Sequence, residues 1–301
     1  MDIYRATPAT ELRNEHAEGP CWDGRTGQLL WIDQYDGLVI VADYDVEQRR
    51  LEPVRNYSLG APVGAVVPTR APGGGWMTAV RHGFAHLALD GTVTLLGQPE
   101  DGAPHRMRMN DGKCDAAGRF YAGSMAFDKV TAAGSLYRLD PDLSLTTVLR
   151  GTTISNGLAW TVRGDELFFI DTPTRRVDRF RVSPDGELHD RRPAVVIEEG
   201  AGYPDGMCID AEGALWVALW GGSAVHRYSP DGSLLGVVEI DAPQVSSCCL
   251  GGPNGNTLFV TTSQEGMSAE ERAAHPQSGR LFCAEVDAYA APAAAFGEPT
   301  G

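Results

Sequence analysis

The sequence predicts an all-β protein, specifically a six-bladed β-propeller. Glycine (36 residues) and proline (19) are plentiful in the 301-residue chain, and helix-period runs are few, which favours short strands joined by tight turns. One motif recurs: a tight or polar start, a short apolar run, a turn rich in Gly or Asp, and a second apolar run. A recurrence every 44 to 49 residues, with about four strands in each unit, is typical of a propeller.

Six copies of the motif divide the chain into units of similar length. The steps are 46, 46, 46, 49 and 44 residues, since the copies begin at Glu18, Gly64, Asn110, Asn156, Asp205 and Cys249. Most copies continue into an alternating strand that closes on a hairpin turn such as PDG or LDG. The six-fold regularity disfavours a large sandwich or jelly roll, and the absence of a recurring GH pair disfavours a WD40 propeller.

The two ends of the chain lie outside this repeat. We expect a single propeller domain over residues 1–287, closed by pairing of residues 2–7 with the last blade. Residues 288–301 are rich in Ala and Pro, so we expect a flexible tail there. No segment has the apolar run of a signal peptide or reaches transmembrane length. A cytoplasmic enzyme is the default expectation.

Charge and cysteine content limit the partners. The formal net charge of −15 disfavours nucleic acid and anionic membrane surfaces, because phosphate groups attract basic proteins. It suits a cation or a neutral substrate, and it also fits an ordinary soluble enzyme with acidic loops. None of the six cysteines forms a C-x-x-C pair. We therefore expect buried small side chains in a reducing compartment, and neither a zinc knuckle nor a redox motif.

Matched positions in successive blades converge on the axis of a propeller. Four of the first five starting positions carry a side-chain oxygen, the set being Glu18, Gly64, Asn110, Asn156 and Asp205. Hard divalent cations take carboxylate and amide oxygens, and the lack of His and Cys disfavours a closed structural zinc site. Asn and Asp before Gly also form turns, but turn formation alone does not explain four positions in phase. The sequence therefore predicts a ring of oxygen ligands at one end of the channel.

Several long blocks resemble the SMP-30/gluconolactonase/regucalcin family. They are EGPCW (18–22), RMNDGKCDAAGRFYAGSM (108–125), ISNGLAW (154–160), YPDGMCIDAEGALWVALW (203–220) and SSCCLGGPNGNTLFVTTS (246–263). The blocks occur in the family's order, and the resemblance runs from about residue 12 to residue 286. It implies a six-bladed propeller with one catalytic divalent metal ion in the channel.

The resemblance also implies roles for individual residues. Glu18, Asn156 and Asp205 match the metal ligands of the family. Asn110 matches a residue beside the metal that contacts substrate or bound water. Arg108 matches a residue that binds the substrate hydroxyls or its carbonyl side.

Asp128 departs from the family pattern. It falls where relatives often carry a substrate-binding glutamate. The shorter Asp side chain leaves that contact open, and the alternative is a solvated loop residue.

Family members act mostly as sugar lactonases, one branch hydrolyses organophosphates, and some are described chiefly as calcium-binding proteins. The leading hypothesis is therefore a metal-dependent sugar lactonase. The alternatives are hydrolysis of another ester or phosphotriester, and a calcium-binding propeller without catalysis. Arg108 and Asn110 favour catalysis, since a pure calcium site needs no arginine beside the cation. Ca²⁺, Zn²⁺, Mg²⁺, Mn²⁺ and Fe²⁺ all suit such a site, and the identity of the sugar lactone and the oligomeric state stay open.

Lactone opening needs a polarised carbonyl, a nucleophilic water and a proton for the leaving alkoxide. A divalent ion with open positions polarises the carbonyl and lowers the pKa of bound water. We expect Asp205 to bind the metal and to take a proton from the attacking water, a role worth about 10²–10⁴-fold. We expect Arg108 and Asn110 to hold the hydroxyls and the developing oxyanion. No G-x-S-x-G, Walker A or G-x-G-x-x-G stretch offers a competing chemistry.

Other polar and aromatic residues have simpler interpretations. His16 is expected to be a plain loop histidine, the alternative being a position near the channel mouth, and Lys113 and Cys114 are expected to be structural. Most tryptophans recur inside apolar strands, which favours packing between blades. Trp220, just before Gly221 and Gly222, is the tryptophan expected to face the pocket.

Overall fold

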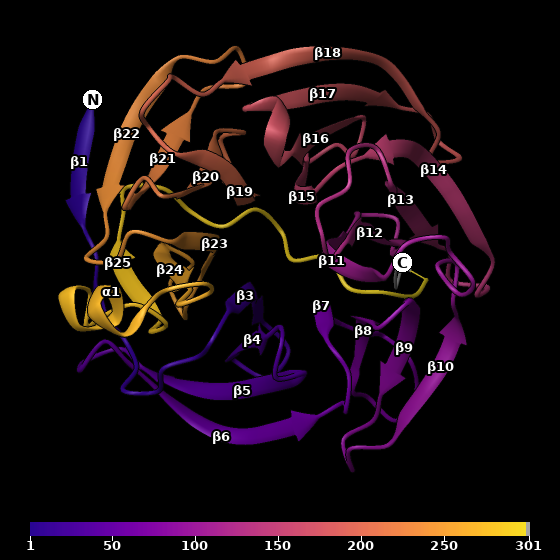
Figure 1. Ribbon diagram of the computed structural model, residues 1–301, viewed down its shortest axis with the longest axis horizontal. Helices are drawn as coiled ribbons and strands as arrows, with labels where there is room; N and C mark the ends of the chain where they lie inside the picture. Colours follow the sequence, from indigo (N-terminus) through magenta and orange to yellow (C-terminus); the bar gives the residue numbers. More distant parts are fainter. Residues whose placement is uncertain (299–301) are drawn as a thin grey trace.

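The computed structural model describes residues 1–298 as six β-sheets arranged around a central channel (Figure 1). The innermost strand of each sheet borders the channel, the six being β3 (Ala17–Asp23), β7 (Val63–Pro68), β11 (Met107–Cys114), β15 (Ser155–Trp160), β19 (Tyr203–Ile209) and β23 (Val245–Gly251). The second strands are β4 (Gln28–Asp33), β8 (Trp76–Val80), β12 (Phe120–Ala126), β16 (Glu166–Asp171), β20 (Leu215–Trp220) and β24 (Thr257–Thr262). The prediction of a six-bladed propeller is confirmed.

In the first five blades the third and fourth strands form the hairpin that follows the second strand, and in the last blade the fourth strand comes from the N-terminus. The third strands are β5 (Leu38–Asp45), β9 (Gly83–Leu87), β13 (Gly134–Leu139), β17 (Arg176–Val182), β21 (Ala224–Tyr228) and β25 (Phe282–Glu285). The fourth strands are β6 (Arg50–Ser58), β10 (Val93–Gly97), β14 (Leu145–Thr152), β18 (Leu188–Val196) and β22 (Leu234–Glu239), with β2 (Thr7–Pro8) in the last blade. Two short helices, η1 (Thr172–Thr174) and α1 (Ala269–Ala274), lie in loops. No helix within residues 1–298 is long and apolar enough to cross a membrane.

The hydrophobic core lies between neighbouring blades. One cluster joins Leu30 and Ile32 of the first blade to Val66 and Trp76 of the second. The second strands are covered on both faces by adjacent sheets, so they read as mostly apolar runs without a clear alternation. All residues of β12 and β24 are buried, whereas most of β6 is exposed at the rim.

The N-terminal segment closes the propeller, but over fewer residues than expected. Thr7 and Pro8 pair antiparallel with β25 and complete the last blade. Residues 2–5 form β1 (Asp2–Arg5), which instead pairs in parallel with β22 of the preceding blade. The free edge of β22 accepts these backbone groups, because an uncovered edge strand carries unpaired N–H and C=O groups. The segment therefore fastens two blades together.

Residues 288–298 are packed against the propeller, which differs from the expectation of a flexible tail over 288–301; residues 299–301 of that expected tail lie outside the described residues. The Ala290 N–H donates to the Gly255 carbonyl at 2.7 Å, and the Phe296 N–H donates to the Pro68 carbonyl at 2.8 Å. Phe296 is buried. In Figure 1 the segment crosses the centre of the ring between these two attachments. The composition could not show this, because small Ala and Pro residues suit both a loose tail and a close crossing.

Candidate active site

A β-bulge near the start of each inner strand positions the predicted ring. The pairing register between first and second strands shifts in all six blades, between residues 18 and 21, 63 and 65, 109 and 112, 155 and 158, 204 and 207, and 245 and 247. A bulge leaves a residue outside the ladder and re-aims its side chain. Each predicted ring residue lies at one of these shifts. In the sixth blade the matching residue is Ser246, so the copy placed at Cys249 is three residues out of phase.

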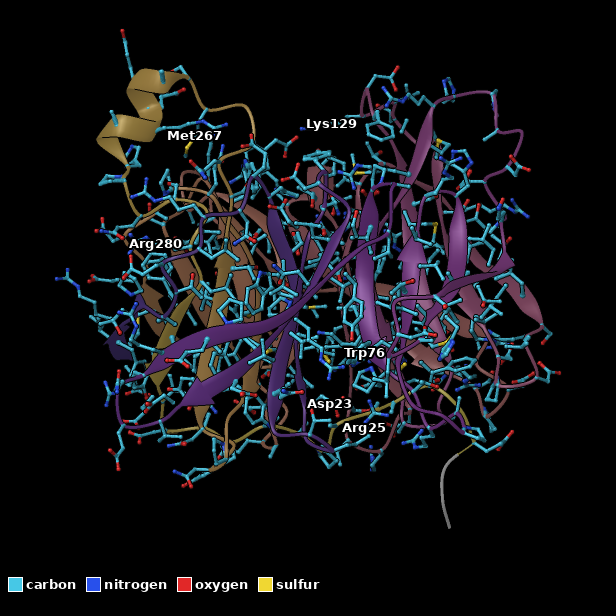
Figure 2. The ribbon with its side chains drawn as sticks, turned by 90° about the horizontal axis from the view of Figure 1, so that it is seen from below. Asp23, Arg25, Trp76, Lys129, Met267 and Arg280 are labelled. Carbon is cyan, nitrogen blue, oxygen red and sulfur yellow. The ribbon has the colours of Figure 1, made fainter. Side chains whose placement is uncertain are left out.

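One small cavity of about 90 Å³ brings together most of the predicted site. Five of the six predicted residues line it, namely Glu18, Arg108, Asn110, Asn156 and Asp205. Lys129 also lines the cavity, and Figure 2 shows it at the same end of the molecule as Met267, opposite Asp23 and Arg25. The candidate site therefore lies at one end of the channel.

Buried carboxylates dominate the charge of this cavity. Glu18 is 4% exposed and Asp205 is 6% exposed. Burial, together with repulsion from Glu18 and Asp111, raises the pKa of Asp205 well above its usual range. Burial and the charge of Asp111 raise the pKa of Glu18 to about 8. Negative charge held in a low-dielectric interior is unfavourable without a compensating cation or proton.

The oxygen atoms of the site suit a hard divalent cation. No residue between 1 and 298 donates a hydrogen bond to the Asp205 carboxylate, so its oxygens are free for a ligand. Within the same range no three His, Cys, Asp or Glu side chains are grouped so as to hold a metal ion. A cation here would therefore use Glu18 and Asp205 together with the amide oxygen of Asn156. Carboxylate and amide oxygens are the ligands that Ca²⁺ and Mg²⁺ prefer.

Hydrogen bonds fix both asparagine side chains. Asn110 Nδ2 donates to the Ser155 carbonyl at 2.8 Å and to Asn156 Oδ1 at 3.1 Å. Asn156 Nδ2 donates to Thr172 Oγ1 at 2.9 Å, and Thr172 in turn donates to the Pro204 carbonyl. These donors leave the Asn156 Oδ1 atom with a second lone pair for a cation. The amide orientations follow from the network and need no ligand.

Arg108 is the principal positive charge beside the carboxylates. It is buried, and it donates to Asn110 Oδ1 through Nη1 and to the Tyr35 hydroxyl through Nη2 at 3.4 Å. The Tyr35 hydroxyl donates to Glu265 Oε1 at 2.8 Å. The Nε atom of Arg108 is buried without a partner among the described residues. The guanidinium is thus anchored at one edge and retains unused donor capacity.

Asp128 does not reach the cavity. It lies in the turn closed by the Lys129 N–H and the Ala126 carbonyl, and its side chain is exposed. Lys129, with φ of 55°, lines the cavity in its place. The exposed position agrees with the alternative of a solvated loop residue. A substrate contact of Asp128 stays a prediction.

Several residues of the cavity were not identified from the sequence. They include Met125, Ile154, Thr172 and Glu265. His16 also lines the cavity, so its interpretation as a plain loop histidine was wrong; burial lowers its pKa to about 4. The sequence did offer one indication that His16 lines the cavity, because it lies two residues before the predicted metal ligand Glu18. Trp220 lines the cavity, which confirms the sequence-based expectation.

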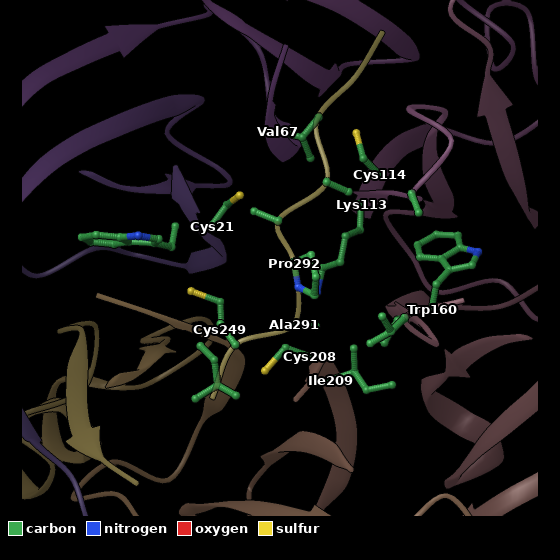
Figure 3. A pocket seen from close by; sticks show the side chains of 18 of the residues that line it. Cys21, Val67, Lys113, Cys114, Trp160, Cys208, Ile209, Cys249, Ala291 and Pro292 are labelled. Atoms are coloured by element: carbon green, nitrogen blue, oxygen red, sulfur yellow. The ribbon is translucent and has the colours of Figure 1, made fainter. Parts of the chain in front are cut away.

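A second cavity, of about 210 Å³, lies between the inner strands and residues 290–294. Four of the six cysteines line it, namely Cys21, Cys114, Cys208 and Cys249. Figure 3 shows Ala291 and Pro292 of the C-terminal segment passing among these thiols and Lys113. The Lys113 ammonium donates to the Met207 carbonyl at 2.7 Å. All six cysteines are free thiols, five of them buried, in agreement with the expectation of small interior side chains.

Comparisons with known proteins agree with the geometry. The family described as SMP-30/Gluconolactonase/LRE-like region matches residues 16–264. Regucalcin of Xenopus laevis is 34% identical over 273 residues, which cover 88% of this chain and 89% of that protein. A putative sugar lactone lactonase of Bacillus subtilis is 32% identical over 274 residues, which cover 90% of this chain and 91% of that protein.

Solved structures show the same architecture. A luciferin-regenerating enzyme is 28% identical and superposes with a TM-score of 0.84, covering 95% of this chain and 96% of its own. A regucalcin from Agrobacterium tumefaciens superposes over the whole of both chains with a TM-score of 0.87, and at 23% identity it supports the fold. By the family match and the curated relatives, the chain belongs to the SMP-30/gluconolactonase/LRE-like family.

Proposed function

We propose that this protein hydrolyses a sugar lactone to the aldonic acid with the help of one divalent cation. The observation that carries the proposal is the placement of two buried carboxylates, Glu18 and Asp205, in one cavity with Arg108 and Asn110. The carboxylates and the Asn156 amide would hold the cation. When bound, the cation supplies a positive charge that polarises the lactone carbonyl and acidifies a water molecule.

The chain's own residues would perform the proton and charge chemistry. Arg108 would donate to the carbonyl oxygen, where negative charge develops as water adds to the carbonyl carbon. Asp205 would accept the proton of that water and return it to the ring oxygen as the carbon–oxygen bond breaks. Asn110, fixed by Ser155 and Asn156, would orient the substrate. Water is consumed, and one carboxylic acid and one alcohol are produced.

The names of the relatives support a second possible function of the same site, namely calcium binding without catalysis. Several relatives are named regucalcin, and one solved relative is described as a calcium-binding protein. A calcium-binding protein without catalysis would use Glu18, Asn156 and Asp205 but not the anchored guanidinium of Arg108. Hydrolysis of other esters or of organophosphates would use all of these residues and a different substrate.

The direct test is proton release from a panel of aldonolactones in weak buffer, with uncatalysed ring opening subtracted. Each lactone is tested with the protein as purified, after EDTA treatment, and after addition of Ca²⁺, Mg²⁺, Mn²⁺, Zn²⁺ or Fe²⁺. We expect hydrolysis that EDTA abolishes and that one or more ions restore. Folded protein that hydrolyses no lactone with any ion would contradict the proposal. If the protein hydrolysed aryl esters or phosphotriesters in preference to lactones, those compounds and not sugar lactones would be its substrate class.

A further inference from the structure

The His16 side chain is held in one orientation from several sides. Its backbone N–H donates to Asp33 Oδ1 at 3.1 Å, and its carbonyl accepts from the Gln34 N–H at 2.9 Å. The imidazole lies beside the rings of Tyr35 and Trp220, with centroid separations of 5.3 and 5.7 Å. Such restraint fixes where the ring nitrogens point, although His16 has no part in the chemistry proposed above.

The hydrogen bonds of Ser263 assign the proton on this ring. His16 Nδ1 lies 2.7 Å from Ser263 Oγ, which also accepts from the Glu265 N–H at 2.9 Å and lies 3.3 Å from the Glu15 carbonyl. One arrangement satisfies all three contacts: Nδ1–H donates to Ser263, and the Ser263 hydroxyl donates to Glu15. The Glu265 carboxylate, 3.8 Å from Nδ1, favours a proton on that nitrogen. The Nε2 atom then carries a lone pair.

The Nε2 lone pair has no partner within residues 1–298, although His16 is 95% buried and lines the cavity with Arg108 and Asp205. A neutral imidazole nitrogen that lines a cavity and has no protein partner is free to accept a hydrogen bond from a ligand donor. Sugar lactones carry hydroxyl donors, and the ring of Trp220 beside His16 offers an apolar surface for the carbon-bound hydrogens of a sugar.

We propose that His16 Nε2 accepts a hydrogen bond from a substrate hydroxyl and so makes His16 a specificity-determining residue. The inference rests on the proposed lactone hydrolysis and deepens it: the preferred substrates are polyhydroxylated lactones. A site built to bond a hydroxyl rejects the analogue that lacks it, because its polar group is then left unpaired.

The test compares two six-membered lactones, D-glucono-δ-lactone and the unsubstituted δ-valerolactone. The quantity measured is the ratio of their kcat/KM values, in which shared effects on the cation and on the ring-opening step cancel. In His16→Phe, which keeps a planar ring and removes the acceptor, we expect this ratio to fall about tenfold, the scale of one hydrogen bond. In Ser263→Ala, which leaves Nδ1–H without its acceptor, we expect a smaller fall in the same direction.

The outcomes separate the inference from the proposed function. An unchanged ratio in both variants, or parallel loss on both lactones, would overturn the role of His16 and leave lactone hydrolysis standing. Wild-type protein that opens neither lactone would overturn both. Thermal melts by circular dichroism show that each variant is folded, and Ser263→Ala provides the test if His16→Phe does not fold.

Discussion

The two ends of the channel are built from the same inner strands but have opposite chemical characters. At one end Glu18 and Asp205 face a cavity with polar partners. Three residues further along the same strands, Cys21 and Cys208 face an apolar cavity beneath the C-terminal segment. The bulges separate the two levels, since the carboxylates lie at the register shifts and the thiols lie in regular pairing beyond them.

Most thiols at the other end are held in the protonated form. Burial raises the pKa of Cys21 to about 12 and holds the pKa values of Cys114 and Cys249 well above their usual range. Cys208 is the exception, because its hydrogen bond with Cys248 lowers its pKa. Protonated thiols are poor nucleophiles and poor metal ligands. We therefore expect catalysis at the bulged end, and packing and closure at the thiol end. The predictions below test this division of roles.

The largest expected effect is on catalysis at the carboxylate end. Asp205→Asn keeps the shape of the side chain and removes its basic oxygen, so kcat/KM for the best lactone should fall by about 10²–10⁴-fold. The matched control is Asp231→Asn, an exposed aspartate on the hairpin between β21 and β22, which should retain wild-type turnover. Asp205→Asn protein that is folded and fully active would show that Asp205 takes no part in the reaction.

The largest expected effect on stability is at the other end. Phe296 is 5% exposed and packs with Val67 and Met109 in one hydrophobic cluster. Phe296→Ala should lower the free energy of unfolding by about 3 kcal/mol, the lower end of the range for buried Phe. Denaturant unfolding measures this, with the exposed Leu143→Ala as control. A change below about 0.5 kcal/mol would mean that the C-terminal segment is not held against the channel.

Cation binding should stabilise the folded protein through the carboxylate end alone. A free cation concentration 100-fold above Kd should raise the free energy of unfolding by about 2.7 kcal/mol. We expect the melting temperature to fall after EDTA treatment and to recover on addition of the activating ion. Glu18→Gln should reduce this recovery, whereas Cys21→Ser should keep it. Recovery that depends on Cys21 would move the cation to the thiol end.

The last expected effect concerns pH. The folded pKa of Glu18 is about 8, above the ordinary value of 4.5, so without a cation the folded state binds more protons between these values. The free energy of unfolding should then decrease as pH rises from about 5 to about 8. Melting temperatures of EDTA-treated protein measure this dependence, and Glu18→Gln should reduce it without abolishing it, since the raised pKa of Asp205 acts in the same direction. A melting temperature that rises over this range would contradict the raised pKa.

The fold and most of the predicted ring of oxygen ligands could be predicted from the sequence. The reason is that the bulged positions of the inner strands carry a recurring acidic or amide residue followed closely by Gly. Glu18, Asn110, Asn156 and Asp205 share a local pattern that a period reveals. In the sixth blade Ser246 is not followed by Gly, so the start of the sixth copy was predicted at Cys249, three residues too late. The positions of residues that are held by contacts with distant parts of the chain could not be predicted from the local sequence.

His16 and the C-terminal segment illustrate such dependence on distant partners. The partner of His16 is Ser263, 247 residues away. Phe296 is attached to Pro68, at the end of β7 in the second blade. For Asp128 the sequence left two alternatives open, and its neighbour Lys129 is the residue of this turn that lines the cavity.

The most direct test of the central claim is a calorimetric titration of EDTA-stripped protein with Zn²⁺, an ion that accepts both oxygen and sulfur ligands. The account predicts one strong site per chain that is lost in Asp205→Asn and retained in Cys21→Ser. A strong site that survives Asp205→Asn and disappears in Cys21→Ser would place the cation among the thiols, and the proposed active site would then be wrong.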